Sequence, residues 1–403
     1  MTKVAVIGQG YVGLPIAISA AKSGYEVLGF DTNQSITNQL NLGYSHISDV
    51  SNEELNSVLS TKNFRASSNP ADLRQAEIVV IAVPTPLDSE KNPDLSFIKS
   101  ACETLAKELS TNALIINEST SYPGTLRNFI MPLLSKSETV KHLYAISPER
   151  VDPGNKQWNV ENTPRLYSGI TKEAADKTRD FYSKFCSNLI EVSSPEVAEA
   201  AKLFENTFRQ VNIALVNEFS NITRSLGISV REVLDAATTK PYGFMRFNPG
   251  IGVGGHCIPV DPSYLAFAAQ SVGASAEFIE LANKVNLEMP NRIADRIIAE
   301  NGGSISGKEI LVCGLSYKSN TPDVRESPSI LLINKLRNEG AIVVWHDPLV
   351  ANFKDETSSS LGNKKFDITI LATFHDVMEL ELISQSANYI FDCLGLIENA
   401  VQL

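Results

Sequence analysis

The most constraining feature of the sequence is a glycine motif near its N-terminus. Gly8, Gly10 and Gly13 follow an apolar stretch, residues 4–7, and open a segment with helical periodicity. Asp31 ends the next apolar stretch, eighteen residues after Gly13 (31 − 13). In a strand–turn–helix unit, the first glycine permits a tight turn, the second lets the backbone approach a pyrophosphate, and the third lets helix and strand pack closely. The motif therefore predicts a dinucleotide-binding fold.

Asp31 indicates which dinucleotide this fold would bind. Its carboxylate would accept hydrogen bonds from the adenosine ribose diol and would repel a 2'-phosphate, which favours NAD over NADP. The helix N-terminus beside Tyr11 and Val12 would attract the phosphates. The alternatives are FAD and a glycine-rich turn without a ligand.

Apolar stretches and helical patterns alternate through the first half of the chain. Strand-like stretches occur at residues 26–30, 78–83 and 114–117, with helical periodicity between them. Such alternation is typical of a parallel sheet with helices on both faces. The same alternation of strand-like and helical segments returns at Lys308, after a polar, Gly/Ser-rich segment at residues 302–307. The sequence therefore predicts an α/β protein with two Rossmann-like, doubly wound domains.

A helical region with one long central helix is expected between these domains. Ser194 is a suitable N-cap, Pro195 suits the first helical position, and the helical pattern continues to Ser225. The expected parts are an NAD-binding Rossmann domain, a helical central domain and a C-terminal Rossmann-like domain, at residues 1–192, 193–301 and 302–403.

The long helix carries one apolar stripe. Its apolar residues recur at steps of three and four, as one face of a helix requires. These residues are Val197, Ala201, Phe204, Phe208, Val211, Leu215, Phe219 and Ile222. Such a stripe packs either within its own chain or against a second subunit.

Composition limits the classes of partner. The 403-residue chain has a net charge of −11, which disfavours nucleic acid and acidic membrane surfaces, so an anionic ligand requires a local cluster of Lys and Arg. No apolar stretch is long enough to span a bilayer, and we expect no secretory signal, because no basic and apolar segment precedes the first expected strand. Five scattered cysteines without a CxxC spacing predict reduced thiols and no zinc site. We expect a cytoplasmic protein without bound metal.

The most unusual stretch is residues 247–261, in which four glycines occupy six positions, 250–255. Cys257 follows this glycine loop, and Asp261 lies four residues further. Backbone N–H groups of such a loop can support a thiolate, the nucleophilic form of cysteine. A buried structural thiol is the commoner fate of a cysteine, but the loop and Asp261 favour a nucleophile here. His256 is a weaker candidate for a general base, because a residue adjacent to the nucleophile usually points elsewhere.

Three polar residues share one face of the long helix. Lys202 and Asn206 are four residues apart, and Arg209 lies three residues further. Alone they would indicate a solvated face. In company with the glycine loop, the ammonium and the amide are suitable donors to a developing oxyanion.

Polar turns follow several of the expected strands. Thr85 and Thr120 come after two of them, and Glu149 and Arg150 follow the apolar stretch 143–146. Ligands bind at the carboxyl ends of parallel strands, so the two threonines are expected near the nicotinamide. Each could equally belong to an ordinary turn. Glu149 suits a base that activates water.

The last domain carries the charges that an anionic ligand needs. Its turn at Gly314 has only one glycine and therefore lacks the dinucleotide motif. Lys318 and Arg325 could bind the phosphates of a nucleotide diphosphate, and with Arg246 they would form the required basic cluster.

These segments together resemble the UDP-glucose/GDP-mannose dehydrogenase family over essentially the whole chain. The motifs occur in the order that the family shows. They are the glycine motif, Pro84–Pro86, Glu118–Thr120, Ser147–Glu149, Lys202–Asn206, Gly254–Cys257 with Asp261, and Tyr317–Lys318 through Arg325–Pro328. The resemblance implies a homodimer formed through the long helix. It also implies that the central domain, residues 193–301, carries a catalytic cysteine loop and that the C-terminal domain, residues 302–403, binds a UDP-sugar.

The resemblance also implies the reaction: a four-electron oxidation of the C6 alcohol of a UDP-sugar, with two NAD+ consumed. Lys202 and a water held by Thr120 and Asp261 would assist the first step, which yields an aldehyde.

Cys257 would then attack the aldehyde to form a thiohemiacetal, whose oxyanion Lys202 and Asn206 would stabilise. A second oxidation would leave a thioester, and Glu149 would position or activate the water that hydrolyses it.

The implied sites contain the following residues. The NAD site comprises Gly8, Gly10, Tyr11, Val12, Gly13, Asp31, Thr85 and Thr120. The UDP-sugar site comprises Glu149, Arg150, Lys202, Asn206, Arg209, Arg246, Gly254, Lys318 and Arg325.

One branch of the family fits best. Val260 stands where UDP-glucose enzymes carry Lys, and residues 147–155 and 205–213 resemble the branch that acts on UDP-N-acetylhexosamines. We therefore expect UDP-N-acetylglucosamine as substrate, with the mannosamine and galactosamine isomers and UDP-glucose as alternatives. A two-electron β-hydroxy acid dehydrogenase is a further alternative, although such an enzyme needs no Cys257 nucleophile. The last alternative function is that of a non-catalytic protein that binds NAD or a nucleotide sugar.

Overall fold

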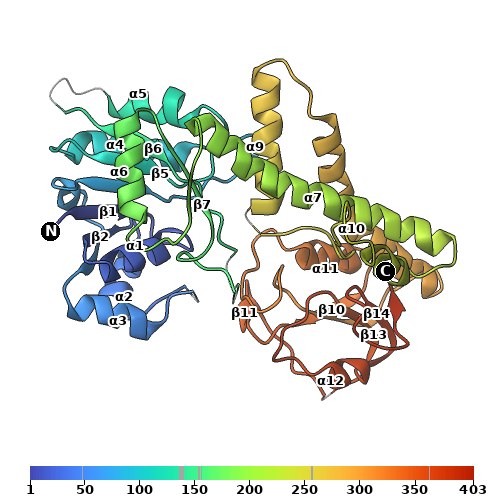
Figure 1. The fold of residues 1–403 in the computed structure, drawn as a ribbon. Coiled ribbons are helices and arrows are strands. Elements are labelled where there is room, and N and C mark those ends of the chain that lie inside the picture. Colours follow the sequence, from blue (N-terminus) through green and yellow to red (C-terminus); the bar gives the residue numbers. More distant parts are fainter. Residues whose placement is uncertain (48, 136–139, 153–154, 156, 256, 363) are drawn as a thin grey trace. The chain divides into compact units, whose positions relative to one another are not determined.

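The computed structural model describes residues 1–403 except 48, 136–139, 153–154, 156, 256 and 363. The described chain folds into two compact units (Figure 1). The first comprises residues 1–205 and 263–274, and the second comprises residues 206–262 and 275–403. Two helices, α7 (Pro195–Ser225) and α9 (Cys257–Ser271), contribute residues to both units.

An eight-stranded sheet, as far as the described residues show, forms the core of the first unit. Its strands are β1 (Lys3–Ile7), β2 (Glu26–Phe30), β3 (Phe64–Ser67), β4 (Ile78–Ile81), β5 (Leu114–Asn117), β6 (Leu143–Ile146), β7 (Arg165–Gly169) and β8 (Leu189–Glu191). Their spatial order is β3-β2-β1-β4-β5-β6-β7-β8. The first six are parallel and have the order typical of a dinucleotide-binding Rossmann domain, whereas β7 is antiparallel to β6. The predicted parallel sheet is confirmed, although the strand expected at 78–83 ends at Ile81.

Helices cover both faces of this sheet. Side chains alternate between the faces along a strand, so Val6 packs in one hydrophobic cluster with Leu14 of α1, and Ile7 packs in a second cluster with Ile98 of α4. The helices of this unit are α1 (Gly13–Lys22), α2 (Gln34–Asn41), α3 (Asn52–Ser60), α4 (Ser96–Glu108), α5 (Met131–Leu134) and α6 (Lys172–Tyr182), with a 3-10 turn at Pro70–Leu73 and a π-helical turn at Leu126–Ile130. The doubly wound arrangement is the one predicted.

The second unit contains a parallel sheet with spatial order β10-β9-β13-β14-β15. Its strands are β9 (Glu309–Cys313), β10 (Ile342–His346), β13 (Phe366–Leu371), β14 (Ala387–Asp392) and β15 (Val401–Gln402). Its other elements are α11 (Pro328–Asn338), α12 (Leu380–Ser384) and the antiparallel pair β11 (Asn352–Phe353) and β12 (Glu356–Thr357). This order is a second Rossmann-like arrangement, as expected from the sequence.

The predicted long helix is confirmed as α7, which begins at Pro195 and ends at Ser225 (Figure 1). It is accompanied by α8 (Val230–Thr238), α9 and α10 (Glu277–Glu300). Much of its apolar stripe is not covered within the chain, because Phe204 is 64% exposed, Leu215 63% and Ile222 48%.

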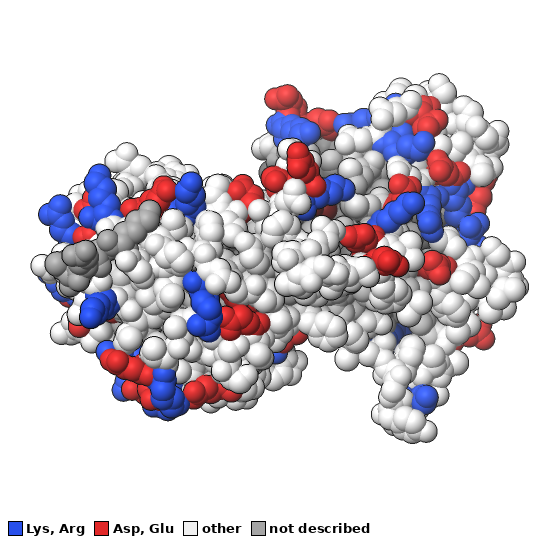
Figure 2. Space-filling view, turned by 90° about the horizontal axis from the view of Figure 1, so that it is seen from above, with Lys and Arg blue, Asp and Glu red and all other residues white. Residues whose placement is uncertain are grey.

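Three features of the described residues bear on membranes, metal ions and charged partners. No helix in the described residues is long and apolar enough to cross a membrane. The part of the chain that the structure describes contains no group of three His, Cys, Asp or Glu side chains that could hold a metal ion. On the face shown in Figure 2, Lys and Arg side chains lie among Asp and Glu side chains.

Asp347, directly after β10, is a buried carboxylate that organises the turn after β9. Its Oδ2 accepts hydrogen bonds from the N–H groups of Leu315 and Ser316, both at 2.9 Å, and from the Ser316 hydroxyl at 2.7 Å. His375 Nε2 lies 3.2 Å from the same oxygen. Burial would raise the pKa of Asp347, but the bonds from His375 and Ser316 outweigh burial and lower the pKa to about 2. The turn thus uses its N–H groups on an internal carboxylate, in agreement with its missing dinucleotide motif.

Asp347→Asn is expected to destabilise the protein by about 2–3 kcal/mol at neutral pH, because the turn loses its charged acceptor. Since the pKa is depressed in the folded state, this stability is present above pH 3.8 and is lost as the pH falls through about 2. The difference in thermal unfolding midpoint between variant and parent should therefore shrink with pH over the acid range in which both stay folded. The exposed Asp355→Asn is the control. A difference that did not depend on acid pH would contradict this assignment.

Candidate active site

The turn between β1 and α1 has the geometry that its glycines predict. Gly8 has φ +90°, and a Cβ there would lie 2.5 Å from the Ala82 carbonyl oxygen. A Cβ at Gly13 would lie 1.8 Å from the Gly8 carbonyl oxygen, so the start of α1 packs directly on the turn. At Gly10, by contrast, a Cβ would meet no atom within 4 Å. The open side of the turn is therefore the one expected to receive a pyrophosphate.

Asp31 lies beside this turn, at the end of β2. Its Oδ2 accepts a hydrogen bond from the Gln9 N–H at 2.9 Å, and its Oδ1 accepts one from the Asn33 N–H at 2.9 Å. In the described residues, no side chain caps the first turn of α1, which begins after Val12. The residues present therefore fit NAD: the amides of the turn and of the helix N-terminus suit its phosphates, and Asp31 suits its adenosine ribose.

The ends of β4 and β5 are tied together by one hydroxyl group. Ser119 Oγ donates to the Val83 carbonyl oxygen and accepts from the Val83 N–H, both at 2.9 Å. Thr85 is buried and Thr120 is half-buried in the segments that follow these strands. The structure thus brings together the two polar turns that the sequence placed near the nicotinamide.

A buried charge network lies in the same unit. Arg165, in β7, is 2.9 Å from Glu118 Oε2 and 3.1 Å from Glu149 Oε2. Its guanidinium also lies 4.7 Å from the centre of the Tyr182 ring, and the Tyr182 hydroxyl donates to Glu118. Arg165 and Tyr182 thus hold two carboxylates of the predicted motifs, and the sequence analysis missed both because neither belongs to a local motif.

Arg165 separates the pKa values of its two carboxylate partners. Burial raises the pKa of Glu118 to about 7, since desolvation outweighs the attraction of Arg165. Burial also acts on Glu149, but the charge of Arg165, the Val151 N–H and the charge of Lys202 together lower its pKa. Glu149 is therefore ionised at neutral pH.

Arg150, expected to bind substrate, is engaged within the first unit. Its Nε and Nη2 donate to the two carboxylate oxygens of Glu205 at 3.1 and 2.6 Å, and its Nη1 donates to the Pro164 carbonyl oxygen at 2.7 Å. Arginine has five N–H donors, so two remain for a ligand.

The predicted glycine loop packs on the predicted nucleotide segment in the second unit. A Cβ at Gly254 would lie 2.6 Å from Tyr317 Cβ, and one at Gly255 would lie 2.6 Å from the Tyr317 ring. The Gly255 N–H donates to the Arg325 carbonyl oxygen at 2.9 Å. These glycines therefore allow a backbone approach that any side chain would prevent.

Two buried asparagines, Asn217 and Asn286, hold the start of this loop. Asn217 Oδ1 accepts from the Gly250 N–H at 2.9 Å, and its Nδ2 donates to Asn286 Oδ1 at 3.2 Å. Asn286 Nδ2 donates in turn to the Gln210 carbonyl oxygen at 3.0 Å. The sequence analysis missed both, since an asparagine in a helical pattern carries no signal of such a role.

Cys257 is the first residue of α9, and its side chain is exposed. The other cysteines are buried, and burial raises the pKa of Cys102 and Cys313 to about 12 and that of Cys186 to about 11. A thiol at a helix N-terminus is favoured as thiolate by the helix dipole. His256, the candidate base, lies outside the described residues.

Asn206 and Asp261 are in direct contact in the second unit. Asn206 Nδ2 donates to Asp261 Oδ2 at 2.5 Å, and both residues are buried. The predicted oxyanion donor is therefore held by the predicted catalytic carboxylate.

The expected basic cluster is more heavily paired than the sequence indicated. Arg325 Nη2 lies 2.5 Å from Asp323 Oδ2, and Arg246 pairs with Asp235. Lys318 is half-buried and Arg209 is exposed. An anionic ligand would thus have to compete with acidic neighbours for two of these four residues.

Three segments match domains of one enzyme family: residues 2–186 match the NAD binding domain, 196–288 the central domain and 311–399 the UDP binding domain. The chain belongs to the UDP-glucose/GDP-mannose dehydrogenase family. As a member of that family it is an NAD-dependent nucleotide-sugar dehydrogenase, an oxidoreductase with NAD as cofactor and a UDP-sugar as substrate.

Individual relatives in this family match over most of their length. Protein CapL of Staphylococcus aureus is 37% identical over 98% of this chain and 96% of its own. The UDP-N-acetyl-D-glucosamine 6-dehydrogenase of Pseudomonas aeruginosa is 37% identical, with 87% and 83% of the two chains covered. The solved structure of the UDP-D-ManNAc dehydrogenase from Pyrococcus horikoshii has a TM-score of 0.89 at 32% identity and covers 100% of this chain and 98% of that one.

Two glycine variants of this dehydrogenase should separate folding from cofactor binding. Gly13→Ala is expected to destabilise the protein by about 1–3 kcal/mol or more, because its Cβ would overlap the Gly8 carbonyl oxygen. Gly10→Ala should fold normally but bind NAD at least about tenfold more weakly, because its Cβ would occupy the open side of the turn. Thermal unfolding and isothermal titration calorimetry measure the two effects. Undiminished NAD affinity in Gly10→Ala would exclude this turn as the pyrophosphate site.

Proposed function

We propose that this enzyme oxidises C6 of a UDP-N-acetylhexosamine from alcohol to carboxylate, with Cys257 as covalent nucleophile. The observation that carries the proposal is the exposed thiol at the start of α9, directly after a glycine loop that packs on Tyr317. When bound, NAD+ supplies the hydride acceptor for both oxidations. The other tasks fall to side chains of this chain.

Lys202 and a water held by Thr120 and Asp261 assist the first oxidation in this proposal, by taking the proton of the C6 hydroxyl. The Cys257 thiolate then attacks the resulting aldehyde carbon. A sulfur–carbon bond forms, and the carbonyl oxygen becomes the oxyanion of a thiohemiacetal.

Lys202 and Asn206 are the proposed donors to this oxyanion. The amide nitrogen of Asn206 has two hydrogens, and one of them is bound to Asp261. That bond fixes the orientation of the amide and leaves the second hydrogen for the oxyanion. Loss of the remaining C6 hydride then converts the thiohemiacetal to a thioester.

Glu149 is proposed to direct the water that hydrolyses the thioester. Its lowered pKa keeps it ionised, and it lies in the field of Lys202. One of its oxygens accepts the N–H groups of Arg150 and Val151 at 2.7 and 2.6 Å, and the other accepts Arg165. A carboxylate offers about four acceptor sites, so one remains for the water. Hydrolysis releases the uronate and returns the Cys257 thiolate.

The nucleotide part of the substrate is assigned to the second unit. Lys318 and Arg325 are proposed to bind the diphosphate, with Arg246 and Arg209 as further cationic contacts, and Gly254 allows the close approach of backbone. Because Arg325 and Arg246 are paired with acids in this structure, substrate binding would exchange those partners. Arg150 would use its two remaining N–H donors.

UDP-N-acetylglucosamine is the proposed substrate, and UDP-N-acetylmannosamine is the second candidate. Val260 is buried in α9, where UDP-glucose enzymes of the family carry Lys, which supports an N-acetylhexosamine. Relatives with both names match this chain at 37% and 35% identity. The P. horikoshii structure favours the second candidate because it covers the whole chain.

The assembly and location follow from the same proposal. Residues 1–192 would bind NAD, 193–301 would carry the nucleophile, and 302–403 would bind the UDP-sugar; the three family matches support this division. The exposed stripe of α7 is proposed as the contact of a homodimer. The unpaired cysteines support a cytoplasmic location, where thiols stay reduced.

Cys257→Ser is expected to retain NAD and UDP binding while uronate production falls on the order of 10³-fold or more, because the hydroxyl is a far weaker nucleophile. Chromatography of the nucleotide sugars measures the product, and calorimetry with NAD and UDP is the control for folding. Uronate production by Cys257→Ser at the parental rate would contradict the covalent mechanism.

A further inference from the structure

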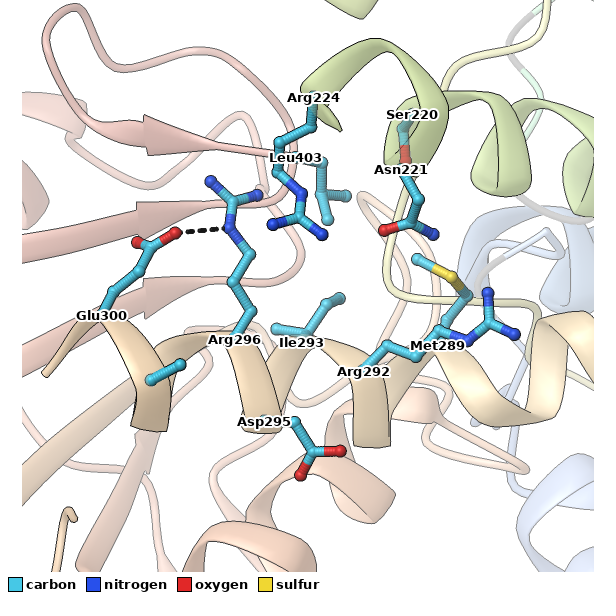
Figure 3. Close-up of a pocket in the computed structure, with 11 residues that line it drawn as sticks. Ser220, Asn221, Arg224, Met289, Arg292, Ile293, Asp295, Arg296, Glu300 and Leu403 are labelled. Carbon is cyan, nitrogen blue, oxygen red and sulfur yellow. Dashed lines mark hydrogen bonds and ion pairs between the residues drawn. The ribbon is translucent and has the colours of Figure 1, made fainter. Parts of the chain in front are cut away.

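The second unit contains a cavity of about 370 Å³ that the proposed reaction does not use (Figure 3). Asn221 and Arg224 of α7 line it, together with Arg292, Ile293 and Arg296 of α10. Among its described lining residues, none is a proposed catalytic, cofactor or substrate residue. Small-molecule sites have volumes of about 300–1,000 Å³, so this cavity is of a suitable size.

Three guanidinium groups surround this cavity (Figure 3). Arg296 is fixed, because its Nε lies 2.7 Å from Glu300 and its guanidinium lies 4.9 Å from the centre of the Phe391 ring. The side chains of Arg224 and Arg292, in contrast, have no hydrogen bond or ion pair within 4 Å in the part of the chain that the structure describes, although Arg224 interacts electrostatically with Glu300.

The acidic residues of the cavity do not neutralise this charge. Burial would raise the pKa of Glu300, but bonds from Tyr389 and Arg296 and the charge of Arg224 lower it, so Glu300 is ionised and already bound. Asp295 points away from the cavity in Figure 3 and lies 3.5 Å from Lys335. Among the side chains that line the cavity, two positive charges therefore remain, those of Arg224 and Arg292.

An uncompensated cluster of this kind costs stability. Arg292 and Arg296 are four residues apart on one helix, where like charges repel, and Arg224 adds a third from the facing helix. In a protein with a net charge of −11, such a cluster concentrates positive potential at one point. A bound anion would remove the repulsion.

We propose that this cavity binds the phosphate group of a small phosphorylated molecule. A phosphate dianion carries the charge that would balance Arg224 and Arg292, and phosphate oxygens are good acceptors for guanidinium N–H groups. Asn221 would donate to polar groups of the ligand, and Ile293 would pack against its apolar part. The site is distinct from the proposed catalytic residues, so its ligand would bind together with NAD and UDP-sugar.

Calorimetric titration with phenyl phosphate and with inorganic phosphate tests this site, with NAD+ and UDP present at saturation and sodium chloride used to hold the ionic strength constant. The variants are the double substitution Arg224→Gln/Arg292→Gln and the control Lys284→Gln, an exposed charge on α10 outside the cavity. Phenyl phosphate should bind the parent and Lys284→Gln equally, and the double variant at least about tenfold more weakly. Inorganic phosphate should bind the parent more weakly than phenyl phosphate does.

Equal affinity of the parent and the double variant for phenyl phosphate would overturn the proposal, as would the absence of binding to the parent. Light scattering, which measures the oligomeric state, tests the remaining explanation, that these arginines pair with acidic residues of a second copy of the chain. If the parent binds no phosphate and the double variant dissociates into monomers, the cluster is a subunit contact instead.

Discussion

Gly254 and Gly255, which lie just before α9 in the sequence, pack against Tyr317, and the proposed chemistry depends on this close approach. Each glycine would bring a Cβ to 2.6 Å from Tyr317, so the approach is possible only without side chains. Cys257 is the first residue of α9 and is exposed. Asp261, one turn further, then reaches Asn206. The proposed nucleophile, carboxylate and oxyanion donor thus all belong to α9 or contact it.

The carboxylates at corresponding places in the two units, Asp31 after β2 and Asp347 after β10, bind different numbers of turn N–H groups. After β2, Asp31 accepts the Gln9 N–H and leaves the rest of its turn open. After β10, Asp347 accepts the N–H groups of Leu315 and Ser316 and the Ser316 hydroxyl, and these donors are therefore not available to a phosphate. Similar strand orders accordingly support one turn with an open side and one turn whose N–H groups are used within the chain. In the first unit, Arg165 keeps Glu149 ionised beside Lys202.

What the sequence could predict depends on how local the determining interaction is. The roles of Gly8, Gly10 and Gly13 follow from one turn, and the bounds of α7 follow from its cap and periodicity, so both were predictable. The role of Arg165 was not predictable, because its partner Glu118 lies 47 residues away in the sequence (165 − 118) and because that role depends on burial.

The same limit applies to polar residues whose partners come from other elements. The contacts of Asn217 and Asn286 were missed because they join two helices to a loop, and the acidic partners of Arg246 and Arg325 were missed because spacing does not reveal pairing. The family resemblance identified the motifs but not these supporting interactions.

The central claim is a four-electron oxidation, and its electron count tests it most directly. NADH formed per nucleotide sugar consumed can be measured with excess NAD+ on UDP-N-acetylglucosamine, UDP-N-acetylmannosamine, UDP-N-acetylgalactosamine and UDP-glucose in parallel. The account predicts two NADH per molecule and a uronate product, with UDP-N-acetylglucosamine preferred. One NADH per molecule, with an aldehyde or ketone as the final product, would contradict it.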